Sequence, residues 1–509
     1  MSKQKNLPPF SYLVIRNKRK FAMGGNGLST LTLPCGRTFC HSGDLDLALI
    51  TRSKKGGYLL LFGLILDLTK PDAGAKKIAK ALFSDLEKGY DIFLKHIDQL
   101  SGRWITIFRE SDTSHVRIMG DATHMLKINY DVVSLDCSSN IFVLKGEKLV
   151  YREEFVKQRH LWKYGSLGNL SPAKGVKILT PNHTLDMDDG RVDRFFPRPE
   201  SVHPLSTENV AREVLRLCRR QAEVLRRKYT LFSSLTAGID SRFSLALAGT
   251  DKRRGDIFFT YLFRQEHMVD ALVGDHVAKL HGLKHYTLSC RDIDSLEGME
   301  SLDLGFLMVE PNLALQKEVS RWVWYSHMLS LVNAYRVMIR NHRDSLPPLA
   351  RWKIISRKKP LHIRSNLYEI GRCFWGRKSL RECHNSKDIL RMSRPDWAKQ
   401  CAGIFEKFFE ETSLGEDFSY GVDLLDLFYW EHRCGTWVSE ILQETDHAFN
   451  THAFVNCRHI ISLLLSIPFE DRVKDVVFRH VIHQELPRLS GFPINPSLDF
   501  VRKQFSDCR

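Results

Sequence analysis

The stretch from Ser233 to Arg242 constrains the fold of this 509-residue chain more than any other. An apolar segment, residues 229–235, runs into the small residues Thr236, Ala237 and Gly238, and a helical pattern follows from Ser241. Small residues let a backbone come close to a ligand, and the first N–H groups of a helix lack intrahelical partners. These donors and the positive end of the helix dipole favour a phosphate. The hydroxyls of Thr236 and Ser241 can add hydrogen bonds, so the sequence predicts a phosphate-binding turn.

The segments that follow the turn alternate between strand and helix patterns. We expect strands at residues 229–235, 257–263 and 285–288, with helices at 241–247 and 269–280 between them. This repetition is typical of a βαβ parallel sheet, in which ligands bind outside the carboxyl ends of the strands. From residue 314 onward the pattern is mostly helical.

The first 200 residues have a different pattern, because most of their apolar runs are short. We expect strands at residues 10–15, 58–66, 104–108, 115–119 and 141–144, and a helix at 73–97. Strands framing helices predict an α+β or sandwich domain. Two prolines in the polar segment 198–204 mark a boundary before a long helix at 207–227. The chain is therefore predicted to have two domains, 1–200 and 201–509.

The charge balance favours anionic partners without choosing among them. The chain has 75 Lys and Arg against 59 Asp and Glu, a formal charge of +16. The short basic clusters at 16–20 and 226–228 are either solvated faces or anion-binding patches. Eleven scattered cysteines without a Cys-x-x-Cys pair favour a reduced, cytoplasmic compartment. The longest apolar run, 58–66, is too short to cross a membrane, and no pattern specifies an oligomeric state.

The turn resembles the PP-loop of ATP pyrophosphatases, whose pattern is Ser-Gly-Gly-x-Asp-Ser after a strand. Thr236 keeps the hydroxyl of the first serine, whereas Ala237 replaces a glycine and needs a negative φ. The resemblance implies that the loop holds the pyrophosphate half of ATP, with Mg²⁺, during attack on the α-phosphorus. The implied ATP contacts are Ser234, Leu235, Thr236, Ala237, Gly238, Ile239, Asp240, Ser241 and Thr260. The alternative is a strand-to-helix turn capped by an aspartate and without a ligand.

The flanking sequence is similar to the asparagine synthetase family over nearly the whole chain. Residues 258–261, then Asp270, Leu280, Gly282 and His285, follow the order of that family's second strand, acidic residue and Leu-Gly-x-x-His end. The resemblance implies that Asp270 lies near the nucleotide and, with Asp240, binds Mg²⁺. Arg242 would place a cation close to the phosphates. Asp270 can also be read as a solvated acid at a helix start.

Residues 100–104, Gly120, Asp121, Tyr130 and residues 179–185 follow the order of that family's glutaminase domain, an Ntn-hydrolase fold. The family's glutaminase uses a cysteine directly after the initiator methionine, whereas this chain has Ser2. The resemblance therefore implies that this chain belongs to a divergent branch of the asparagine synthetase family that lacks the glutaminase cysteine. An Ntn-hydrolase-like sandwich without glutaminase activity would precede an adenine-nucleotide α-hydrolase-like synthetase domain with a parallel sheet and a helical C-terminal half.

Charged residues in the C-terminal half supply further candidates. Asn366, Glu369 and Arg372 lie at helical spacing and could face one pocket, and we expect Glu369 and Arg372 to join Asp240 and Arg242 as catalytic residues. Glu431 and Arg433 are interpreted as a structural ion pair or, alternatively, as catalytic.

These features together predict an ATP-dependent ligase of asparagine-synthetase type, with ATP and Mg²⁺ as cofactors. A small-molecule or glycan-linked acid would be adenylated and then transferred to an amine to form an amide. One alternative is a PP-loop enzyme acting on tRNA, which the net charge of +16 allows. Another alternative is a non-catalytic nucleotide-binding homologue. The replacement of a glycine by Ala237 favours this alternative.

Overall fold

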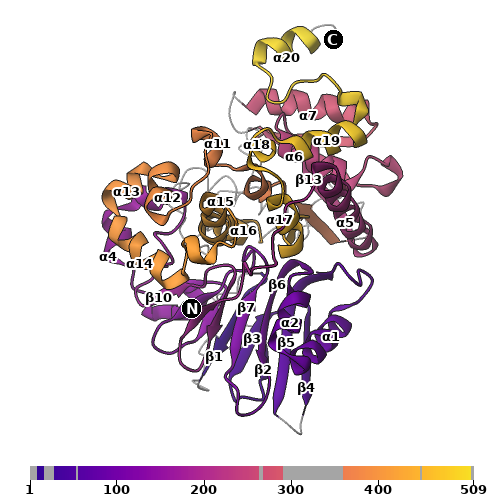
Figure 1. The fold of residues 1–509 in the computed structure, drawn as a ribbon. Helices are drawn as coiled ribbons and strands as arrows, with labels where there is room; N and C mark the ends of the chain where they lie inside the picture. Colours follow the sequence, from indigo (N-terminus) through magenta and orange to yellow (C-terminus); the bar gives the residue numbers. More distant parts are fainter. Residues whose placement is uncertain are drawn as a thin grey trace, which may run out of the picture.

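The computed structural model describes residues 9–16, 28–52, 56–262, 267–289, 359–446 and 450–505. Ser2, residues 17–20 of the first basic cluster and residues 314–358 of the helical region lie outside the described residues. The fold is mixed α/β, with antiparallel sheets in the first 200 residues and a parallel sheet with many helices after them (Figure 1). No described helix has both the length and the apolar character needed to cross a membrane.

The N-terminal part contains two six-stranded antiparallel sheets. The first has the order β10 (Val176–Ile178), β8 (Asn129–Asp131), β9 (Cys137–Ser138), β1 (Tyr12–Ile15), β3 (Thr38–Ser42) and β2 (Leu28–Thr32). The second has the order β12 (Val192–Arg194), β11 (His183–Asp186), β7 (Arg117–Gly120), β6 (Leu100–Arg109), β5 (Gly57–Asp67) and β4 (Leu47–Arg52). The predicted strands at 58–66, 104–108 and 115–119 belong to the second sheet.

Strand β5 is buried on both faces, which explains its unbroken apolar sequence. Phe62 packs against Tyr12 and Phe39 of the first sheet, with ring centroids 5.1 and 4.8 Å apart, so the two sheets lie face to face. Leu59 and Leu61 point the other way, into the core beneath the helices α1 (Ala75–Lys88) and α2 (Tyr90–Ile97).

Two local predictions for this part need correction. The single helix expected at 73–97 is two helices, because Gly89 interrupts it with a φ of 149°. The strand expected at 141–144 is wrong, since these residues form the short helix α3 (Ile141–Lys145). The Asn140 side chain caps α3 by accepting a hydrogen bond from the Phe142 N–H, and a short apolar run fits either element.

The C-terminal part contains a five-stranded sheet in which every neighbouring pair is parallel. Its order is β15 (Lys284–Ser289), β14 (Ile257–Leu262), β13 (Tyr229–Ser234), β16 (Lys359–Ile363) and β17 (Asn450–His452). The sequence predicts the first three strands but not β16 and β17. From the central strand β13 the chain forms β14 and β15 on one side, and it then adds β16 and β17 on the other side.

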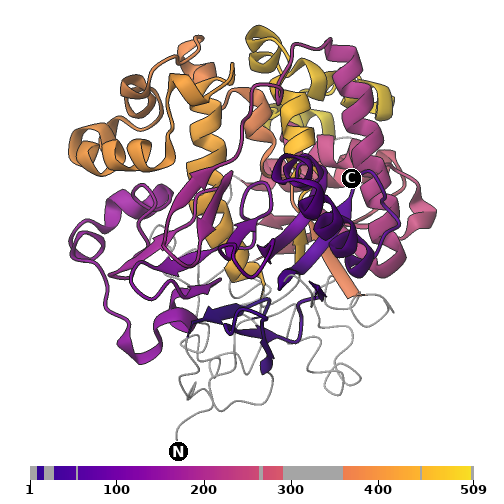
Figure 2. The ribbon, with the colours of Figure 1, turned by 60° about the horizontal axis from the view of Figure 1, so that its bottom comes forward.

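Helices connect and cover this sheet, including α5 (Thr207–Lys228), α6 (Ile239–Ala248), α7 (Met268–Leu280) and α19 (Val476–Glu485). One apolar core runs from α1 and α2 through to the parallel sheet and the C-terminal helices. Turned so that the antiparallel sheets come forward, the N-terminal strands lie mostly in the lower half of the view, with most helices of the C-terminal part above them (Figure 2).

The second basic cluster, residues 226–228 at the end of α5, is largely neutralised. Arg226 pairs with Asp256, and Arg227 pairs with Asp72, which also binds Arg220. Two of the three cations in this cluster therefore already have carboxylate partners, which argues against the anion-binding interpretation of this strip.

Candidate functional site

The loop that resembles a PP-loop follows the central strand of the parallel sheet. Strand β13 pairs with β14 on one side and with β16 on the other, so the strand order reverses beside it. In open α/β sheets the crevice outside the carboxyl ends of the strands at such a reversal is the usual ligand site. The strand ends at Ser234 and α6 begins at Ile239, two residues before the predicted start of the helix.

The backbone of the loop is free of left-handed residues. Ala237 does not have a positive φ, and Gly238, the cap of α6, has φ −74° and ψ 162°. The replacement of a glycine by Ala237 therefore introduces no strain. A Cβ built on Gly238 would lie 3.6 Å from Asn495 Oδ1 and from Thr236 Oγ1, which are ordinary contacts. Neither conformation nor packing requires glycine at position 238, but Gly238 is the N-cap of α6, where glycine is preferred to alanine, and a glycine there also lets a ligand come close to the backbone.

Hydrogen bonds within the loop hold its shape. The Thr236 N–H donates to Ser241 Oγ (3.0 Å), and the Thr236 hydroxyl lies 3.0 Å from the same atom. The Ala237 N–H donates to Asp270 Oδ1 at 2.9 Å. Ser241 and Asp270 thus both fix the loop, and Ser241 is buried. The positions that stay partly exposed alternate with buried ones and are Ser234, Thr236, Gly238 and Asp240, whereas Leu235, Ala237 and Ile239 are buried.

Arg242 is held by contacts within the protein. Its side chain is buried, and it donates to the carbonyls of Ala237 (3.0 Å), Phe492 (3.2 Å) and Pro493 (2.8 Å). Burial lowers the pKa of Arg242 to about 10. The Asn495 N–H also donates to the Ala237 carbonyl, at 3.0 Å. Arg242 therefore clamps the loop to a C-terminal segment, and the sequence gives no local sign of this contact.

Thr260 is also placed differently from the prediction. Its side chain is buried; its hydroxyl donates to the Leu235 carbonyl and lies 2.9 Å from His285 Nε2. Gly274 of α7 covers these groups, because a Cβ there would be 2.5 Å from the Leu235 carbonyl and 2.6 Å from Thr260 Oγ1. Leu235 and Thr260 thus support the loop through contacts within the protein.

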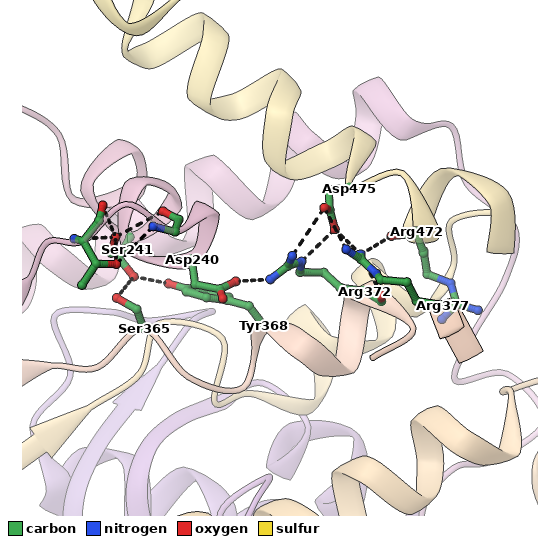
Figure 3. A network of polar contacts seen from close by, with 11 residues as sticks. Asp240, Ser241, Ser365, Tyr368, Arg372, Arg377, Arg472 and Asp475 are labelled. Carbon is green, nitrogen blue, oxygen red and sulfur yellow. Dashed lines mark hydrogen bonds and ion pairs between the residues drawn. The ribbon is translucent and has the colours of Figure 1, made fainter. Parts of the chain in front are cut away.

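Asp240 is the loop residue that connects to the C-terminal half. Figure 3 shows its carboxylate bonded to Arg372, which ends the 3-10 helix η8 (Tyr368–Arg372). The Arg372 Nε donates to Asp475 Oδ1 at 2.7 Å, and Asp475 also pairs with Arg377. The side chains of Asp240 and Arg372 keep 29% and 14% of their surface exposed. The structure therefore brings the predicted residues Asp240 and Arg372 together and adds Asp475 and Arg377, which the sequence analysis missed.

Burial and mutual repulsion change the acidity of this cluster. Burial raises the pKa of Asp240, and the Arg372 guanidinium opposes this rise. Burial, followed by repulsion from Asp240, raises the pKa of Glu369 to about 7. The Glu369 Oε2 atom is inaccessible and has no hydrogen-bond partner among the described residues. A pKa near neutrality is typical of a general acid or base. Asn366, the third member of the predicted group, is instead bound by Arg364 Nε (2.5 Å).

Glu431 and Arg433 do not pair with one another, which corrects their interpretation as a structural ion pair. Glu431 is buried and pairs with Arg194 from the first 200 residues. The Arg433 guanidinium donates to the Tyr164 carbonyl and stacks 3.7 Å from the ring centre of Trp437. Both residues lie on a ten-residue π-helix, Tyr429–Val438, an uncommon element that is frequent at functional sites.

One group of residues with metal-binding geometry lies elsewhere, in the N-terminal part. His115, Asp186 and Asp188 place their ligand atoms within 4.8 Å of one another. Asp188 already accepts from Arg37 (3.1 Å) and from the Val116 N–H (2.8 Å). His115 lies 2.7 Å from Asp186, so these side chains already satisfy one another without an ion.

Comparison with known proteins adds no relatives. No protein-family model matches the chain, and no curated protein matches it at a significant level.

Proposed function

We propose that this chain is a cytoplasmic ATP-dependent ligase that adenylates a substrate carboxylate at the loop after β13 and transfers the acyl group to an amine. The observation that carries the proposal is the loop itself. It lies where the strand order reverses, and it contains a glycine, Gly238, that neither backbone conformation nor packing requires. In this proposal residues 201–509 are a synthetase domain of the PP-loop type, and residues 1–200 are an Ntn-hydrolase-like scaffold without glutaminase activity.

The exposed side of the loop suits a triphosphate with a divalent cation. The N–H groups at the start of α6 would bind phosphate oxygens, because they lack intrahelical partners. Asp240 and Asp270 each use Oδ1 in a contact within the protein, and no hydrogen bond involves either Oδ2 among the described residues. Two free carboxylate oxygens beside phosphates match the ligands that Mg²⁺ prefers. When bound, Mg²⁺ would neutralise charge on the leaving pyrophosphate.

The proposed reaction has two steps. In the first, a carboxylate oxygen of the substrate attacks the α-phosphorus, and the bond from that phosphorus to the bridging oxygen breaks to release pyrophosphate. In the second, an amine nitrogen attacks the acyl carbon and AMP leaves with the electrons of the acyl–oxygen bond. Glu369 takes the proton that the nitrogen loses, which its pKa of about 7 permits. Arg372, which is bound to Asp240, stabilises the negative charge that develops on the reacting groups beside Asp240.

Pyrophosphate release tests the proposal directly. The purified protein, ATP, Mg²⁺ and a broad panel of carboxylic acids should release pyrophosphate with at least one acid. Asp240→Ala should abolish the release, whereas Asp91→Ala, which removes an exposed carboxylate from α2, should leave it unchanged. Release that Asp240→Ala does not alter would refute the role of the loop.

The two alternatives predict other outcomes. A PP-loop enzyme acting on tRNA would copurify with RNA and release it as salt is raised. The neutralised arginines of α5 do not favour this alternative. A non-catalytic homologue would bind ATP without releasing pyrophosphate, but its main argument, strain at Ala237, is absent.

A further inference from the structure

A cavity of about 210 Å³ lies between the antiparallel sheets and the helix α14 (Ala402–Thr412). Its walls come from β8 and β10 of the first sheet, from β12 of the second and from the last turn of α14. Strands β10 and β12 are the outermost strands of their sheets, and Figure 1 shows α14 beside β10. Sites for drug-sized ligands measure about 300–1,000 Å³, so this cavity suits a smaller molecule.

Hydrogen bonds fix the last turn of α14 to both sheets. Lys177 Nζ on β10 donates to both carboxylate oxygens of Glu411, each at 2.7 Å. Asn169 Nδ2 donates to Glu411 Oε2 at 2.9 Å. On the side of the second sheet, Arg194 Nε donates to the Thr412 carbonyl at 2.8 Å. The walls of the cavity are therefore held in place without a ligand.

Two hydroxyls in the cavity wall have no partner. Tyr130 on β8 and Thr180 between β10 and β11 are each only 5% exposed, and neither hydroxyl forms a hydrogen bond within the described residues. Neither oxygen is inaccessible, however, so a molecule in the cavity can reach both. Polar groups buried this deeply are nearly always paired. These two hydroxyls are therefore available to a molecule inside the cavity.

The charges around the cavity balance one another. Although burial opposes it, hydrogen bonds from Lys177 and Asn169 lower the pKa of Glu411, so its carboxylate stays ionised beside the Lys177 ammonium. Burial, followed by the negative charge of Glu411, raises the pKa of Tyr130 well above its usual value, so its phenol keeps its proton. A cavity with one compensated ion pair favours a neutral ligand, because a charged one would lose its hydration without gaining a counter-charge.

The remaining wall groups require a ligand that both donates and accepts hydrogen bonds. The hydroxyls of Tyr130 and Thr180 can donate, whereas Asn169 Oδ1, which has no hydrogen bond in the part of the chain that the structure describes, can only accept. Hydroxyl groups on a ligand meet both needs at each atom. Aliphatic side chains complete the wall, those of Ile178, Leu179 and Val192. Several hydroxyls on a ring with aliphatic C–H groups are the chemistry of a sugar.

We propose that this cavity binds one neutral sugar ring, which forms hydrogen bonds with the hydroxyls of Tyr130 and Thr180. Free monosaccharides and the end residue of a glycan share this chemistry. The site lies on other elements than the loop after β13, so it does not rest on the proposed ligase function. The N-terminal part would then bind a ligand of its own, besides supporting the parallel sheet.

Saturation-transfer NMR followed by titration calorimetry tests the site on the full-length protein. The probes are neutral hexoses and pentoses at up to millimolar concentrations, each with its methyl glycoside and with its charged uronic acid and 2-amino derivatives. At least one neutral sugar should bind, and its charged derivatives should bind more weakly, because the cavity has no free counter-charge for them. Binding of the methyl glycoside as well identifies a glycan end as the source, whereas binding of the free sugar alone identifies a monosaccharide.

Two variants each remove one hydroxyl and keep the shape of the side chain. Tyr130→Phe and Thr180→Val should each weaken sugar binding about two- to ten-fold, the contribution of one neutral hydrogen bond. Neither should lower the melting temperature, because neither hydroxyl has a partner within the described residues. The matched control is Tyr12→Phe, which removes a buried hydroxyl that donates to the Lys127 carbonyl at 3.1 Å. It should lower the melting temperature and leave sugar affinity unchanged.

The inference is overturned if no neutral sugar binds, or if Tyr130→Phe and Thr180→Val both bind the sugar as the unaltered protein does. Tighter binding of a charged derivative than of its neutral parent would refute the charge balance on which the class of ligand rests. A fall in the melting temperature of both variants as large as that of Tyr12→Phe would show that their hydroxyls serve the fold and not a ligand.

Discussion

Substitution of Gly238 by alanine separates a requirement of the fold from a requirement of the ligand. The φ of −74° and ψ of 162° suit alanine, and the new Cβ would meet its neighbours at 3.6 Å. Gly→Ala stabilises a protein by about 0.4–1 kcal/mol where the backbone suits alanine, because it restricts the unfolded chain, but alanine is a poorer N-cap than glycine by up to about 1 kcal/mol. These two effects oppose each other, so the melting temperature should change by no more than about 2–4 °C in either direction.

ATP binding should weaken clearly, whereas the stability of the fold should change little. If a phosphate lies against Gly238, the added methyl group must displace it, and overpacking of this kind costs about 1–3 kcal/mol, or about 5- to 150-fold in affinity. Calorimetric titration with ATP and Mg²⁺, alongside a thermal melt of the same sample, measures both effects. The matched control is Gly274→Ala, whose Cβ would meet the Leu235 carbonyl at 2.5 Å and should lower the melting temperature. Unchanged ATP affinity in a stable Gly238→Ala protein would refute the argument that glycine serves a ligand.

Three further substitutions test the electrostatics. Amide formation should increase as pH rises through about 7, where Glu369 loses its proton, and Glu369→Gln should remove this inflection but leave pyrophosphate release. Arg242→Gln should lower the melting temperature and weaken ATP binding, because three carbonyls lose a charged donor; a stable variant with normal ATP affinity would contradict the clamp. His96 is half-buried between Asp67 (3.1 Å) and Asp85 (2.7 Å), which raise its pKa against the effect of desolvation. Because a raised histidine pKa stabilises the fold below the unfolded value of about 6.5 and this contribution is lost as pH rises through the folded value, His96→Gln should destabilise more at pH 5.5 than at pH 8. Equal loss at both pH values would show that His96 acts by packing alone.

Local sequence patterns were sufficient to predict the strands and helices in the part of the parallel sheet that carries the loop. Strands β13, β14 and β15, with α6 and α7 between them, follow from apolar runs and helical spacing that need no distant partner. Strands β16 and β17 have five and three residues and exist through pairing with β13 and with each other, so no local pattern marked them. The helix α3 was missed because a short apolar run between polar residues suits either element.

The residues of the candidate site could be named from the sequence more easily than the contacts between distant segments. Asp240 and Gly238 could be named because the turn lies within ten residues of sequence. Arg372 was named from the sequence, but its ion pair with Asp240 depends on tertiary packing, and so does Asp475, which binds Arg372 and was not named. The contacts of Arg242 with the carbonyls of Phe492 and Pro493 also depend on tertiary packing, so no local pattern indicated them.

The hydrogen bonds from residues 492–495 to Arg242 and the loop also affect the stage of synthesis at which the loop becomes restrained. Residues 492–495 contribute three hydrogen bonds to the loop, two to Arg242 and one to the Ala237 carbonyl. Yet the last strand of the sheet, β17, ends at His452, so every strand has left the ribosome before these residues do. A nascent chain can therefore assemble the described strands of the sheet while the loop after β13 still lacks these restraints. The loop would become fully restrained only after residues 492–495 have been synthesised.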